Sequence, residues 1–162
     1  MISFRSPSFS FFTFDYTNYD HLVFLRKMEK DPLIQKYLKS ISEFLLEGDS
    51  GDKLSNAYLV GHNDDIIGYL NLFNDGYSEE FHYAVAPDFR SIRNNSNETY
   101  GCRILKEASQ AIFDRHLEIE YIKLYIEKKN LRSVNTAVRA GFLKWEPFGP
   151  MDEYRKFPGG FR

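Results

Sequence analysis

The first third of the chain combines two hydrophobic patterns. Aromatic and polar residues alternate in part over residues 8–17, which favours a strand. Apolar residues then recur at helical spacing over residues 21–30, so a helix is expected there, with Asp20 or Thr17 as its N-cap. A second helix is predicted over residues 32–48, because a proline stands in its first turn and glycines follow its end.

The middle of the chain has the pattern of consecutive strands. Two β-rich runs over residues 57–73 surround the polar stretch at residues 62–65, which predicts a hairpin. The turn-forming residues 74–76 then lead into a strand over residues 80–86. Alternation along that strand places neighbouring side chains on opposite faces of the sheet.

Helical and strand periods alternate in the remainder of the chain. A helix is predicted over residues 100–113, a strand over residues 121–130 and another helix over residues 131–142. Residues 143–157 form a last hairpin, with turn residues at 149–153. This order predicts an α/β fold with a mixed central sheet and helices on both faces.

Composition limits the size and the partners of the protein. With 162 residues, of which 43% are hydrophobic and 27% charged, the chain is long enough for one globular core, so we expect a single domain over residues 1–162. Lysine and arginine number 21 against 23 acidic residues, and this balance gives no general attraction for nucleic acid. No apolar run approaches the roughly 20 residues that cross a bilayer, so we expect a cytoplasmic protein without a membrane partner.

Cysteine and histidine indicate neither a disulfide nor a metal site. Cys102 is the only cysteine, which excludes an intramolecular disulfide and fits a reducing compartment. The four histidines are not paired with one another or with Cys102 at metal-ligand spacing. Because Cys102 has no histidine partner nearby in sequence, we interpret it as a small packed thiol rather than as a nucleophile.

The most informative order of elements lies in residues 81–142. A strand ends at Pro87, a polar loop leads to a helix that has Gly101 near its start, and a second strand ends at Asn130. The last helix closes with Gly141, eleven positions after that asparagine. This order resembles the core of the GNAT superfamily of acyl-CoA-dependent N-acyltransferases. The same asparagine and glycine are also ordinary N-cap and C-cap residues of a helix.

The resemblance implies that acetyl-CoA is the co-substrate. In the family, the strand with a V-x-P terminus diverges from its neighbour, and the exposed main chain pairs with the amides of the pantetheine arm. A glycine-rich signature then holds the pyrophosphate at a helix N-terminus. Only Gly101 fits that signature here, and residues 91–100 look like an insertion after Arg90. The residues expected to contact acetyl-CoA are Tyr83, Ala84, Val85, Arg90, Tyr100, Gly101, Cys102, Asn130 and Phe142.

Candidates for proton transfer also follow from the resemblance. The family often places a glutamate near the start of the diverging strand, and we expect Glu80 to be the general base, with His82 as a second candidate. Glu79 points to the opposite face of the strand. Many members have a tyrosine as general acid where this chain has Ala137. Ser133 can replace it by protonating the thiolate; otherwise it is an ordinary first-turn serine.

The implied activity is transfer of an acetyl group from acetyl-CoA to a primary amine by direct attack in a ternary complex. Main-chain amides near the end of the diverging strand would stabilise the oxyanion. The Asn-x-x-Ser start of the last helix resembles the subgroup that acetylates protein N-termini, including those of ribosomal proteins. A protein N-terminus, a polyamine and an antibiotic amine all remain possible acceptors, and both a monomer and a homodimer are possible. The alternative is a non-catalytic GNAT-like domain that binds CoA or a protein.

Overall fold

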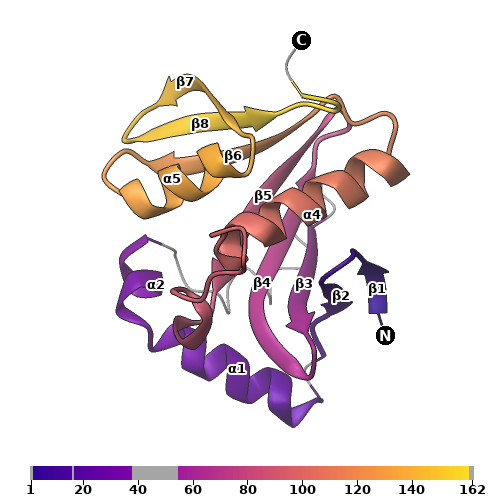
Figure 1. Ribbon diagram of the computed structural model, residues 1–162, viewed down its shortest axis with the longest axis vertical. Coiled ribbons are helices and arrows are strands. Elements are labelled where there is room, and N and C mark those ends of the chain that lie inside the picture. Colours follow the sequence, from indigo (N-terminus) through magenta and orange to yellow (C-terminus); the bar gives the residue numbers. More distant parts are fainter. Residues whose placement is uncertain (1, 16, 38–54, 161–162) are drawn as a thin grey trace.

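The computed structural model describes residues 2–15, 17–37 and 55–160. In this part of the chain the strands form one eight-stranded sheet in the order β1-β2-β3-β4-β5-β6-β8-β7 (Figure 1). The strands are β1 (Ile2–Arg5), β2 (Ser10–Thr13), β3 (Ser55–His62), β4 (Asp65–Asn74), β5 (Ser78–Val85), β6 (Tyr121–Glu127), β7 (Leu143–Phe148) and β8 (Met151–Lys156). The helices are α1 (Tyr19–Glu29), α2 (Pro32–Tyr37), the short 3-10 helix η1 (Pro87–Phe89), α4 (Tyr100–Arg115) and α5 (Leu131–Arg139).

Helices cover both faces of the sheet, as the sequence predicts. Ile104 and Leu105 of α4 are fully buried in the larger hydrophobic core, on one face. Phe24 and Met28 of α1 and Ile34 of α2 form a second core on the other face. In the described part of the chain, no helix combines the length and apolar character needed to span a bilayer. The mixed α/β fold class is therefore confirmed.

The N-terminal segment differs from its prediction in two ways. Only the central part of the predicted strand at residues 8–17 is extended, as β2, and it pairs antiparallel with β1, a strand that the pattern did not predict. The N-cap of α1 is Asn18, so the choice of Asp20 or Thr17 was wrong. Thr17 donates its hydroxyl to Asp15, whereas Asn18 Oδ1 accepts the amide of Asp20 at 2.9 Å.

The second predicted helix begins where expected. Pro32 lies in its first turn. The Asp31 carboxylate accepts the amides of Leu33 and Ile34 at 2.9 and 3.1 Å and so caps the helix. The predicted continuation over residues 38–48 lies outside the described residues.

The two predicted hairpins are present. β3 and β4 are joined by Asn63 and Asp64, and Asn63 has a φ of 54°, a conformation that asparagine tolerates better than most residues. The turn between β7 and β8 is only Gly149 and Pro150, not the predicted residues 149–153. It is shorter because the residues that follow pair with β6 as part of β8.

β5 and β6 are parallel neighbours at the centre of the sheet, yet they pair at only three positions. The last of these pairs joins Glu80 to Lys123, and beyond it the two strands are not paired. Val85 and Ile126, near the carboxyl ends, therefore have no partner across this gap. The sheet opens between the ends of β5 and β6, where the resemblance implied that strands diverge.

α5 is bounded by the two residues that the motif singled out. Asn130 caps its start, and Oδ1 of this side chain accepts the amide of Ser133 at 3.3 Å. Gly141 has a φ of 91°, and its amide donates to the Val138 carbonyl at 3.0 Å, while the Phe142 amide donates to Ala137. These bonds make a Schellman motif. Both capping interpretations are confirmed.

Candidate functional site

A cavity of about 830 Å³ occupies the opening between β5 and β6. Its walls come from α2, the ends of β5 and β6, the loop before α4 and the first turns of α4 and α5. Of the predicted site residues it is lined by His82, Tyr83, Ala84, Val85, Arg90, Gly101, Asn130 and Ser133. A second hollow of about 800 Å³ lies between β2, the start of α1 and the β3–β4 turn, where no strands diverge. Of these two cavities, only the first is lined by predicted site residues.

Main-chain groups of β5 alternate between the neighbouring strand and this cavity. The Ala86 amide donates to the carbonyl of Ile67 in β4. In an antiparallel pair, the main-chain groups of every second preceding residue of β5 therefore also face β4. The N–H and C=O groups of Tyr83 and Val85 consequently face the opening. The main chain of Ala84 faces β4, so the expectation that it contacts acetyl-CoA applies only to its side chain.

Arg90 is occupied by the protein itself. Its Nε donates to the Val85 carbonyl at 2.8 Å, and its Nη1 lies 2.9 Å from both carboxylate oxygens of Asp31. The side chains of this ion pair are only 14% and 7% exposed. Arg90 therefore joins the end of β5 to the start of α2 through Nε and Nη1, and it also lines the cavity.

The N-terminus of α4 approaches the cavity through its main chain. Thr99 caps the helix by accepting the amide of Cys102 at 3.4 Å, and among the described residues no acceptor is bonded to the amides of Tyr100 and Gly101. A Cβ on Gly101 would lie 3.3 to 3.4 Å from Thr136 and from the ring of Tyr83. The glycine thus allows α4 to pack closely on β5 and α5.

Two side chains of this helix start point away from the cavity. The Tyr100 ring packs against Phe9 and His62, at centroid distances of 6.1 and 5.2 Å, with the Arg103 guanidinium over it. Cys102 is buried in the larger core, and burial raises the pKa of its thiol. Neither residue is among those that line the cavity, so their side chains are not placed to contact a ligand there.

Phe142 is also a core residue. It is 1% exposed, packs in the larger hydrophobic core and does not line the cavity. Phe142 was expected from the sequence to contact acetyl-CoA, but its buried side chain does not reach this cavity. Ala137, at the position of the missing tyrosine, is fully buried in the same core.

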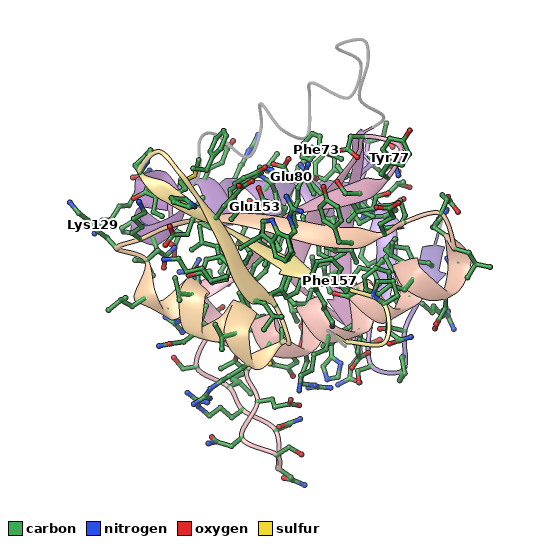
Figure 2. All side chains as sticks on the ribbon, turned by 90° about the horizontal axis from the view of Figure 1, so that it is seen from above. Phe73, Tyr77, Glu80, Lys129, Glu153 and Phe157 are labelled. Carbon is green, nitrogen blue, oxygen red and sulfur yellow. The ribbon has the colours of Figure 1, made fainter. Side chains whose placement is uncertain are left out.

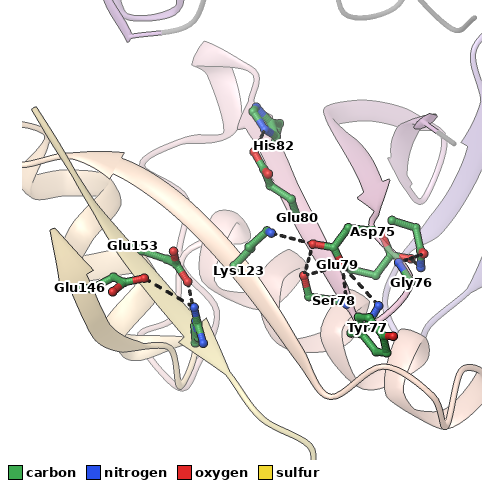
Figure 3. A network of polar contacts seen from close by, with 12 residues as sticks. Asp75, Gly76, Tyr77, Ser78, Glu79, Glu80, His82, Lys123, Glu146 and Glu153 are labelled. Atoms are coloured by element: carbon green, nitrogen blue, oxygen red, sulfur yellow. Dashed lines mark hydrogen bonds and ion pairs between the residues drawn. The ribbon is translucent and has the colours of Figure 1, made fainter. Parts of the chain in front are cut away.

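The remaining candidates lie on the face of the sheet that α1 and α2 cover. Glu80 Oε1 is 2.6 Å from Nε2 of His82 (Figure 3), whereas Glu79 points to the other face and accepts from Asn74 Nδ2 at 2.7 Å. Burial raises the pKa of Glu79. The alternation predicted for the two glutamates is thus correct, and Glu79 has no access to the cavity.

Tyr125 faces the cavity on the same side of the sheet. It stands opposite Glu153 of β8, and Figure 2 shows Glu80 and Glu153 on this side. Burial, the charge of Glu153 and a hydrogen bond to it raise the pKa of Tyr125 to about 12. Its phenol stays protonated at neutral pH.

No family model matches this sequence, and no curated protein matches it either. Solved structures do. One is the N-acetyltransferase PseH from Campylobacter jejuni in complex with acetyl coenzyme A, at 18% sequence identity and a TM-score of 0.66, with 92% of this chain and 98% of that chain covered. Another is the aminoglycoside acetyltransferase AAC(6')-Ib with coenzyme A and kanamycin, at 15% sequence identity and a TM-score of 0.65, with 94% of this chain and 95% of that chain covered. A GNAT-family acetyltransferase from Bacillus anthracis has 13% identity, 96% coverage of both chains and a TM-score of 0.67. The chain has the GNAT fold.

Several side chains at the cavity were not predicted as site residues. Lys129, Arg132 and Arg139 line it together with Arg93, so cationic side chains outnumber the carboxylate of Glu127 in the lining. Arg132 and Arg139 are seven residues apart, which places them on one face of a helix, so this signal was present in the sequence. Tyr125 could be found only from the position at which the GNAT sheet opens.

Proposed function

We propose that the protein transfers an acetyl group from acetyl-CoA to a primary amine. The proposal rests on the main-chain groups of Tyr83 and Val85. They face a large cavity between β5 and β6, where no strand pairs with this edge of β5. An arm with two amides fits such an edge as an added strand. Structures with this fold were solved with acetyl coenzyme A or coenzyme A bound, which supports the same co-substrate here.

The cationic side chains in the lining of the cavity suit the phosphates of acetyl-CoA. The amides of Tyr100 and Gly101 stand at a helix N-terminus, which favours anions. Arg132 and Arg139 line the same cavity and supply charge. Helix amides and arginines thus replace the glycine-rich signature that the chain lacks, and we assign phosphate binding to them instead of to Arg90.

The amine would approach from the face that carries Glu80 and His82. The acetyl group would lie near Tyr83, whose main-chain amide can donate to the oxyanion. Glu80 and Ser133 remain the proposed groups for proton transfer, and Ser133 lines the cavity at the start of α5. The resemblance to the subgroup that acetylates protein N-termini makes a peptide amine one acceptor to test, beside a polyamine and an aminoglycoside.

The proposal is tested in two steps. Calorimetry with acetyl-CoA should show binding, and at a hundred times the dissociation constant the ligand should add about 2.7 kcal/mol to the free energy of unfolding. Release of free thiol is then measured with spermidine, kanamycin and a peptide with a free N-terminus. A folded sample that binds no acetyl-CoA at millimolar concentration would contradict the proposal. Binding without turnover of any amine would favour the non-catalytic alternative.

A further inference from the structure

Two polar side chains of β4 are buried without a hydrogen bond. Both amide atoms of Asn71 and the hydroxyl oxygen of Tyr69 are closed to solvent, and none of these atoms has a hydrogen-bond partner in the described part of the chain. Burial raises the pKa of Tyr69 far above its usual value, so its phenol keeps the proton. Buried polar groups in native proteins are nearly always paired, because an unpaired one destabilises the fold. The two side chains therefore point to a partner that enters from outside the fold.

Asn71 and Tyr69 lie beside the cavity between β5 and β6. In the β4–β5 ladder Asn71 is paired with His82. Two residues earlier, Tyr69 is paired with Ala84. Residues paired across an antiparallel ladder have their side chains on one face, with Cβ atoms about 4.5 to 5.5 Å apart. Because His82 and Ala84 line the cavity, the two unpaired polar groups stand one strand away from its wall.

The neighbours on the far side of this pair are apolar. In the β3–β4 ladder Asn71 is paired with Ala57. Tyr69 is paired there with Leu59, and it packs in the second core with Ile34 of α2. Ile34 also lines the cavity. The side chains of β3 thus offer no polar partner, whereas the space between α2 and β5 opens into the cavity.

We propose that Asn71 and Tyr69 bind the amine acceptor and select acceptors with a neutral group beside the amine that both donates and accepts hydrogen bonds. The inference rests on the proposed function, in which the amine approaches from this face of the sheet. The acceptor enters between α2 and β5 and replaces apolar contacts over the two side chains by hydrogen bonds. Neither residue takes part in proton transfer, so their role is specificity.

The hydrogen-bonding capacity of the pair defines the class of acceptor. The Asn71 amide has two donor hydrogens and an acceptor oxygen, and the Tyr69 hydroxyl both donates and accepts. The peptide group next to a free N-terminus has both kinds of atom, and so do the hydroxyls of an amino sugar. The protonated amines of spermidine only donate, so they leave Asn71 Nδ2 unpaired. A site whose buried donor stays unpaired disfavours such a ligand strongly.

Melting temperatures test the buried groups without acetyl-CoA or an amine. Asn71→Leu replaces the amide by an apolar side chain of similar shape and should raise the melting temperature by roughly 2 to 10 °C, because unpaired polar atoms leave the core. Tyr69→Phe deletes only the hydroxyl and should raise the melting temperature by a smaller amount. A fall in the melting temperature of both variants overturns the proposal, because the two groups are then satisfied before any acceptor binds.

Turnover then shows whether the same groups bind the acceptor. With the peptide or with kanamycin, Asn71→Leu should raise the KM for the amine roughly 10- to 100-fold and change kcat much less, the pattern for lost substrate hydrogen bonds. Tyr69→Phe should raise this KM roughly three- to tenfold. The KM for spermidine should change less than about threefold, since it does not use these groups fully. Acetyl-CoA affinity, measured by calorimetry, should equal that of the parent. The parent's kcat/KM for the peptide and for kanamycin shows which of the two supplies the neutral group.

Ser109 supplies the matched control, because it is a fully buried polar residue of α4 whose hydrogen bond is made within the protein. Its hydroxyl donates to the Leu105 carbonyl. Ser109→Ala should leave the KM of every amine unchanged. An Asn71→Leu protein with the parent's KM for the peptide and for kanamycin overturns the inference and leaves the proposed function intact, and so does a parent that prefers spermidine to both. A parent that acetylates none of the three amines contradicts the proposed function, and the inference is then refuted with it.

Discussion

Replacing Arg90 by alanine should destabilise the protein whether or not acetyl-CoA is present. The substitution leaves the Asp31 carboxylate, 7% exposed, without its partner and removes the hydrogen bond to the Val85 carbonyl. Breaking a buried ion pair costs about 3 to 5 kcal/mol, which lowers the melting temperature of a domain of this size by roughly 6 to 20 °C. The end of β5 should also become less ordered, because Arg90 joins it to α2.

The destabilisation by Arg90→Ala should be present at neutral pH and lost in acid. Burial alone would raise the pKa of Asp31, but hydrogen bonds and the charge of Arg90 lower it overall. A carboxyl with a lowered pKa in the fold contributes stability above its unfolded pKa of about 3.9 and loses it as the pH falls through the folded value. Melting temperatures of the parent and of Arg90→Ala should therefore differ at pH 7 and converge below about pH 4.

The assay is thermal unfolding without ligand, in a double-mutant cycle with Asp31→Ala. If the two residues act as a pair, the double variant should be less destabilised than the sum of the single variants. Asp88→Ala is the control, because its pair with Lys27 is exposed and worth at most about 1 kcal/mol. An Arg90→Ala protein with the parent's melting temperature and a large loss of acetyl-CoA affinity would refute this reasoning and return Arg90 to the phosphate site.

Two further predictions concern the helix starts and the C-terminal strand. Gly101→Val should weaken acetyl-CoA binding, measured by calorimetry, at least about tenfold, roughly 1.4 kcal/mol, because the new side chain displaces the Tyr83 ring. Asn95→Ala should not change this affinity. A folded Gly101→Val protein with the parent's affinity would contradict the prediction. Burial lowers the pKa of Lys156 to about 8, so the folded state disfavours its charge, and stability should rise with pH between about 8 and 10.5. Lys156→Met should accordingly raise the melting temperature at pH 7 by a few degrees, with a gain that shrinks as the pH approaches 10, and an equal gain at both pH values would show that the charge is not the cause.

Local patterns predicted the elements around the site well. The interval from Asn130 to Gly141 predicted a capped helix, and its caps have the expected hydrogen bonds. The strand before Pro87 was predicted from alternation, and its divergence from the next strand was implied by the resemblance. Such features depend on neighbours in sequence or on motifs of a few residues, so one sequence is enough to find them.

Contacts between distant segments could not be predicted. The partner of Arg90 is Asp31, 59 residues earlier, and no spacing rule connects them. Tyr100 packs its ring against Phe9, a residue far away in the sequence that precedes β2, and no local pattern indicates this contact. A motif also does not separate main-chain from side-chain contacts, which is why Phe142 was expected at the site although its ring belongs to the core.

The opening in the sheet gives β5 an alternating pattern of amide protection. The amides of His82 and Ala84 face β4, whereas those of Tyr83 and Val85 face the cavity. Hydrogen–deuterium exchange along this strand should therefore be slow and fast at successive residues, although all of them lie at the centre of a sheet. A ligand that binds as an added strand would slow exchange only at the amides of Tyr83 and Val85. Exchange at single amides therefore reports whether a ligand fills the gap and whether it pairs with β5.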